Sequence, residues 1–207
     1  MGNLFNVDNK FFTLMGLIFD LTVLNILYVI SCIPIFTIGA ATTALYDMTL
    51  KMVKNEESYI VRGYFKAFKR NFKNGTILGI LATIIAIILG TNVYASNLNL
   101  DNGTMWVLLF IFNLSLTILF WLIMAYIYPI QALKELTMVG VLKSSLYSSV
   151  RYLPTTILVV ILNSIFPFCM VWNLYTMTYG IVIYAIIGCS IITYFNSIYL
   201  IRVLEEK

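Results

Sequence analysis

The chain has 207 residues, of which 61% are hydrophobic and only 11% are charged, and its 13 Lys and Arg residues outnumber its 9 Asp and Glu residues. About a quarter of the residues in a soluble domain are charged, so this composition excludes an ordinary water-soluble fold and indicates an integral membrane protein in a lipid bilayer. The basic residues flank apolar stretches and alternate with aromatic residues, which is typical of an anionic membrane surface and excludes nucleic acid as a partner.

Six apolar segments follow one another along the chain. Pro34 separates the first two, and the second is the least apolar because it holds several threonines and Asp47. It either crosses the membrane or enters and leaves on the same side. Without an alternating strand pattern, the segments predict an all-α polytopic bundle in one membrane domain, residues 1–207. The predicted spans are approximately residues 11–33, 35–53, 76–96, 105–128, 154–170 and 175–199.

The six-span arrangement places all 13 Lys and Arg residues on one side of the membrane. The positive-inside rule makes that side the cytoplasm, with both termini there. A five-span alternative treats residues 11–53 as one crossing plus an interfacial piece, and it misplaces only Lys10. The alternatives differ at Cys32, which faces the outside only with six spans.

The segment 59–73, YIVRGYFKAFKRNFK, predicts an amphipathic helix in the cytoplasmic interface. On a helix its aromatic residues share one face and its cations an adjacent face, with aromatics towards the acyl chains and cations towards the headgroups. Two interpretations stay open: a topological anchor, or a docking surface for an acidic partner. The candidate cations are Arg62, Lys66, Lys69, Arg70 and Lys73.

Asp20 lies near the middle of the first predicted span. Placing a charged carboxylate there costs about 3 kcal/mol or more in free energy, unless it pairs with polar partners or stays protonated. Asn25 lies five residues further on and is a second candidate for an intramembrane polar site. The pair is either a structural clamp between the first two helices or a site that handles protons or cations.

Small residues mark candidate helix contacts. Gly39, Ala40 and Ala44 belong to the run TIGAATTA, and Gly75 with Gly79 forms a GxxxG pattern. Such residues let helix backbones approach closely, either within the bundle or against another membrane subunit.

Residue types that carry chemistry are scarce. The chain has no histidine, and its three cysteines lie in apolar sequence without a CxxC motif. We therefore expect no metal site, no cofactor and no disulfide framework. The GxSxG, HExxH and GxxxxGK[ST] motifs are absent. An aspartyl protease pair of Asp20 and Asp47 is disfavoured, because a GxGD motif is missing and the two are expected at different depths. The sequence predicts a protein that is not an enzyme.

Several stretches resemble the YesL-like family of bacterial integral membrane proteins, most closely in the N-terminal eighty residues. The resemblance rests on Asp20-Leu21, Leu24-Asn25, Pro34, Thr37 to Tyr46, Tyr64 to Lys69 and Asn71-Phe72. It implies a multi-pass protein of the bacterial cell membrane, often encoded beside carbohydrate-uptake ABC transporters. The family is uncharacterised, so the resemblance implies a setting and no mechanism.

We therefore expect a non-enzymatic accessory component of a carbohydrate ABC uptake system, with ABC sugar-transporter subunits as partners. The alternative is a small transporter or ion-coupled carrier that uses Asp20 as its coupling residue. The sequence indicates neither the oligomeric state nor the molecule that is transported or sensed.

Overall fold

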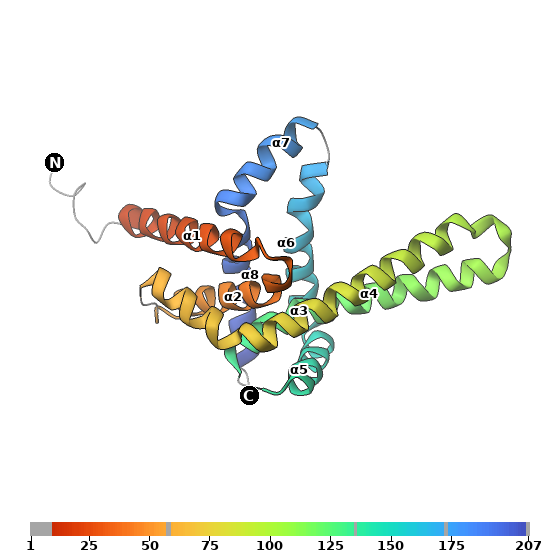
Figure 1. The fold of residues 1–207 in the computed structure, drawn as a ribbon, viewed down its shortest axis with the longest axis horizontal. Coiled ribbons are helices and arrows are strands. Elements are labelled where there is room, and N and C mark those ends of the chain that lie inside the picture. The colour runs from red at the N-terminus through yellow and green to blue at the C-terminus, as the bar shows by residue number, and fades with distance from the viewer. Residues whose placement is uncertain (1–9, 57–58, 135, 172–173, 206–207) are drawn as a thin grey trace.

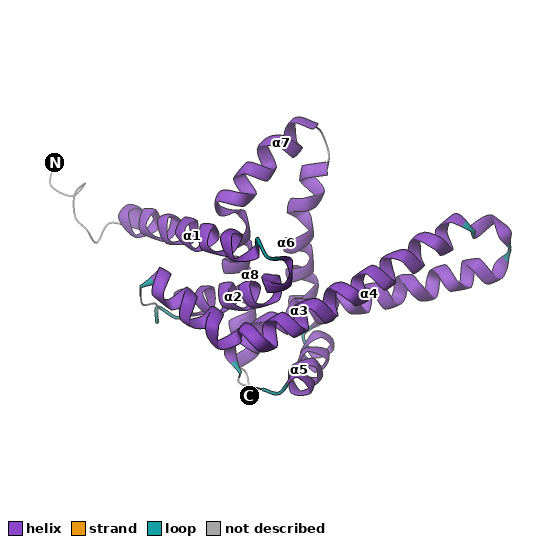
Figure 2. Cartoon of the chain, viewed as in Figure 1, coloured by secondary structure: helices purple, strands orange, loops and turns teal. Residues whose placement is uncertain are grey.

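The computed structural model describes residues 10–56, 59–134, 136–171 and 174–205. All regular structure in these residues is helical (Figure 2), so the all-α prediction is confirmed. Each of the six predicted apolar segments is helical. The main helices are α1 (Lys10–Cys32), α2 (Ile38–Val53), α3 (Ile60–Leu98), α4 (Thr104–Leu133), α5 (Met138–Arg151), α6 (Leu153–Val171), α7 (Leu174–Ile183) and α8 (Cys189–Glu205), with a π-helical segment, η3 (Tyr184–Gly188), between the last two.

Four helical segments are long and apolar enough to cross a membrane: Phe11–Cys32, Ile60–Leu98, Thr104–Leu133 and Met177–Leu204. The pair Met138–Arg151 and Leu153–Ile165 becomes a fifth if it is taken as one bent span. These assignments rest on length and composition, and they roughly fit the six predicted spans.

Helix α2 is the segment that falls short of a span. Its 16 residues extend roughly 24 Å at 1.5 Å per residue, less than a hydrocarbon core of about 30 Å. Most of its side chains are buried, and it packs against α1, α3, α4 and α8. The segment that was hardest to place from sequence is therefore the central helix of the bundle.

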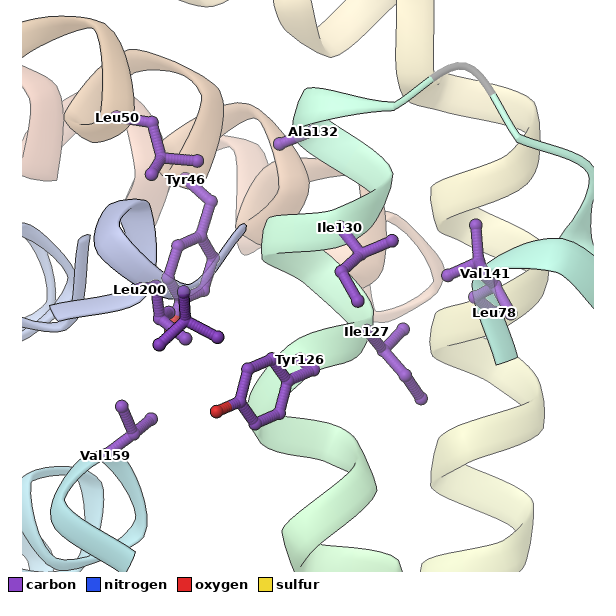
Figure 3. Packing of buried hydrophobic residues seen from close by; sticks show 11 residues of the cluster. Tyr46, Leu50, Leu78, Tyr126, Ile127, Ile130, Ala132, Val141, Val159 and Leu200 are labelled. Carbon is purple, nitrogen blue, oxygen red and sulfur yellow. The ribbon is translucent and has the colours of Figure 1, made fainter. Parts of the chain in front are cut away.

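Two apolar clusters share α2. One joins its Tyr46 and Leu50 to buried residues of α3, α4, α5, α6 and α8, including Tyr126 and Leu200 (Figure 3). The other joins its Leu45 and Met48 to α1 and α3. Because both clusters depend on α2, this helix holds the N-terminal and C-terminal helices together.

The α3–α4 hairpin extends away from this core, and α6 and α7 leave it in another direction (Figure 1). Gly103, with a φ of 125°, lies between the short 3-10 segment Leu100–Asn102 and α4. A side chain with a Cβ rarely adopts that φ, so glycine at this position allows the tight turn. Large apolar side chains along the hairpin are exposed.

Helix α3 runs without interruption through residues predicted as two elements, an interfacial helix and a span. Its buried side recurs at helical spacing from the basic half into the apolar half. The segments predicted as an interfacial helix and a span thus form one 39-residue helix packed on α2. The buried residues are Tyr64, Ala67, Asn71, Gly75, Leu78, Gly79, Ala82 and Ser96.

A sharp bend separates α5 from α6. The two helices meet at 103° around Tyr152. In a continuous helix the ring of Pro154 would clash with the carbonyl of Val150, whereas proline is tolerated in the first turn of a new helix. The Thr137 side chain caps the start of α5 by accepting a hydrogen bond from the Gly140 N–H at 3.3 Å.

Candidate functional site

Charged residues meet where α2, α3 and α4 converge. Asp47 is buried and accepts hydrogen bonds from Lys51 Nζ at 2.7 Å and from Arg70 Nη2 at 2.8 Å. Arg70 Nη2 also donates to the carbonyl of Ala132 at 3.2 Å. Arg70 therefore ties α3 to α2 and to the end of α4. We call this end of the bundle, with Lys51, Arg70 and Lys134, the basic end.

Arg70 differs in this respect from the other four cations of the predicted docking segment. Arg62, Lys66, Lys69 and Lys73 are exposed and form no ion pair with any described residue. Their charges are available to headgroups or to a partner. The guanidinium of Arg70 instead stabilises the buried carboxylate, a role that residue spacing alone did not indicate.

Asp20 lines a cavity of about 460 Å³ between α1, the end of α2 and α8. Polar neighbours in the lining are Thr13, Asn55 and Tyr194. Asn55 follows α2, so Asp20 lies level with the end of that helix. The cavity is partly polar, and Asp20 is its one acidic lining residue among the described residues.

Asn25 has a separate role. It is fully buried, and its Nδ2 donates to the carbonyls of Tyr184 at 3.1 Å and Ala185 at 2.7 Å. Its Oδ1 accepts from the Ser190 N–H at 2.8 Å. A π-helical turn leaves backbone carbonyls and N–H groups without their usual partners. The Asn25 side-chain amide bonds to both, because it carries a donor and an acceptor. Asn25 thus fastens α1 to the π-helical segment, and the structure does not bring it together with Asp20.

The small residues meet between α2 and α3. A Cβ on Gly39 would lie 2.1 Å from the Gly75 carbonyl oxygen and 2.8 Å from Gly79 Cα. A Cβ on Gly75 would lie 2.7 Å from Ala40 Cα. These backbones are in direct contact within the chain, so this face is covered internally. Ala44 is buried nearby in the cluster shared by α1, α2 and α3.

Polar residues between α2 and α8 were not predicted as a group. Thr49 Oγ1 and Ser197 Oγ share a hydrogen bond of 2.8 Å, and Asn196 Nδ2 donates to the Tyr46 hydroxyl at 3.5 Å. These residues lie about 150 positions apart in the chain, so only the packing of α8 on α2 brings them together. The sequence signal that could have predicted this contact is the helical spacing of polar residues in α8, at Ser190, Thr193 and Ser197.

No group of three or more His, Cys, Asp or Glu side chains suited to a metal ion occurs in the part of the chain that the structure describes. Cys32 and Cys189 are half-buried free thiols.

A family model described as "Protein of unknown function, DUF624" matches residues 21–93. The matched residues include Asn25, Asp47, Arg70 and the glycine contact between α2 and α3. No curated protein matches the chain, and no solved structure does. The YesL-like resemblance stays a prediction. Residues 21–93 of this all-helical, membrane-type chain are similar to the DUF624 family, whose function is unknown.

Proposed function

We propose that the chain is a non-enzymatic, multi-pass accessory protein of a carbohydrate ABC uptake system in the bacterial cell membrane. The transporter association comes from the setting that the family resemblance implies. The structural support is that the two halves of α3 expose different surfaces. Its basic half exposes cations, and its apolar half forms the projecting α3–α4 hairpin (Figure 1).

The uncovered hairpin is the observation that carries this proposal. In the most apolar stretch of Thr104–Leu133, 0% of the residues are buried inside the chain. Leu108 and Phe112 are each 59% exposed and lie one helical turn apart. In a bilayer, lipid chains cover such a surface, and in this proposal the apolar helices of a transporter replace lipid along the hairpin, while Lys66 and Lys69 lie at the opposite end of α3.

Co-purification from native membranes tests the proposal. A tagged chain, gently solubilised, should recover the permease and ATPase subunits of a carbohydrate importer, identified by mass spectrometry. Leu108→Ala with Phe112→Ala should lower that recovery several-fold at unchanged membrane abundance. Phe19→Ala is the control, because Phe19 is 67% exposed but lies on α1. The idea fails if the wild-type chain recovers no importer subunit.

Asp20 supports a second candidate, a small transporter or ion-coupled carrier. Its carboxyl lines a cavity of about 460 Å³ that is large enough for a small solute. In liposomes, Asp20→Asn should abolish proton-linked uptake without lowering the amount of inserted protein. Thr22→Val on the same helix is the control, since Thr22 Oγ1 bonds, among the described residues, to the carbonyl of Ile18 in its own helix. An unchanged rate for Asp20→Asn removes this residue from the mechanism.

A further inference from the structure

A second cavity, of about 620 Å³, opens at the basic end between α3, the end of α4 and the start of α5. Its lining is mostly polar or basic, and none of the described lining residues is acidic. The lining residues are Arg70, Asn71, Asn74, Gln131, Lys134, Leu136, Thr137 and Met138.

Gln131 is the most informative residue of this lining. Its side chain is only 6% exposed, yet neither Nε2 nor Oε1 has a hydrogen-bond partner. An unpartnered buried amide costs about 1–3 kcal/mol, so a native side chain of this kind normally has a hydrogen-bond partner, from the protein, a water molecule or a ligand. Gln131 could satisfy both atoms with a ligand that offers an acceptor and a hydroxyl donor.

The electrostatics of the cavity favour an anion. Lys134 lines it and forms no ion pair with any described residue. Arg70 also lines the cavity, held in place by its bonds to Asp47 and Ala132, but its charge is already balanced by Asp47, so Lys134 supplies the unpaired charge. Helix α5 begins at this cavity, and the first backbone N–H groups of a helix lack partners within it and attract anions.

We propose that this cavity binds a phosphate-bearing ligand. Lys134, Arg70 and Gln131 Nε2 would donate to the phosphate oxygens together with the start of α5, while Gln131 Oε1 and Asn74 would contact the polar remainder. The volume exceeds that of a single phosphate, so it suits either a phospholipid headgroup or a soluble phosphorylated compound. Both sources share the same phosphate chemistry, and the site is independent of any association with a transporter.

Two probes distinguish the sources, using the purified full chain in an uncharged detergent. In the first arm, thermal stability is followed as inorganic phosphate replaces chloride at constant ionic strength. In the second, native mass spectrometry compares retention of phosphatidic acid with that of phosphatidylcholine. A shift with phosphate but no selective retention of phosphatidic acid identifies a soluble ligand, and selective retention of phosphatidic acid identifies a headgroup.

The variants localise the binding. Lys134→Gln and Gln131→Leu should each weaken it about tenfold, because each removes a hydrogen bond to a charged group. Lys143→Gln is the control: it removes the same charge from the exposed face of α5, outside the cavity lining. Melting without ligand establishes that each variant is folded, and Gln131→Glu, which places a carboxylate in the lining, should also abolish binding. Binding of neither probe, or an equal loss in Lys143→Gln, would overturn the proposal.

Discussion

At the scale of single residues, three glycines set the distance between α2 and α3. Any side chain at Gly39 meets backbone atoms of Gly75 and Gly79, which cannot rotate away. The helices would have to separate, and the buried residues around Tyr64 and Ala44 would lose their packing.

Gly39→Ala should therefore destabilise the protein by about 1–3 kcal/mol, the usual cost of overpacking. Gly90→Ala is the matched control, because a Cβ at Gly90 meets nothing within 4 Å and alanine favours the helix by about 0.5–1 kcal/mol. The melting temperatures of both variants are measured by heating them in detergent and then running size-exclusion chromatography. Equal melting of the two variants would contradict the close contact.

The ion pair of Asp47 with Arg70 gives a second prediction at this scale. Asp47→Asn leaves a buried amide against two cations and should cost about 1–3 kcal/mol. Arg70→Gln should be less harmful in the Asp47→Asn background than in the wild type, because the interaction is already lost. A double-mutant cycle of thermal stabilities measures the coupling, and additive effects would show that the two side chains act independently.

At the scale of elements, the Asn25 amide fastens α1 to the π-helical segment. Asn25→Leu removes three hydrogen bonds and leaves two carbonyls and the Ser190 N–H without this partner. We expect a loss of about 2–4 kcal/mol, spread over these bonds.

Hydrogen exchange tests this junction directly. Amides of residues 184–190 should exchange faster in Asn25→Leu, whereas those of residues 64–71 in α3 should keep their rates. Thr22→Val serves as the control, since its bond stays within α1. A uniform increase along the whole chain would mean general unfolding and not a local junction.

The existence of the helices was predictable, because backbone groups in lipid must bond within their own segment and apolar helices therefore appear as long runs. Their packing was not. The contact of Asp47 with Arg70 depends on the register of α2 against α3, which hydropathy does not encode. The continuity of α3 was hidden by the change in composition near Lys73 and by the turn-favouring pair Asn74-Gly75, which the structure keeps helical where Gly75 contacts α2. The α5–α6 bend follows from Pro154, but its angle of 103° depends on tertiary packing.

At the scale of the whole molecule, the topology stays a prediction that labelling can decide. In a variant with Cys32, Cys169 and Cys189 replaced by alanine, Asp101→Cys should react with an impermeant maleimide in intact cells. Lys66→Cys should react only after permeabilisation, because the positive-inside rule places the basic end in the cytoplasm. The opposite pattern would reverse the orientation and remove the proposed docking and phosphate sites from the cytosol.

Helix α3 has 39 residues and is roughly 58 Å long at 1.5 Å per residue, more than the about 40–45 Å of a bilayer with its headgroups. If α3 crosses a bilayer, it must therefore tilt or protrude beyond the headgroups. Because no break interrupts it, a change in its tilt at the basic end would also move the turn at Asp101.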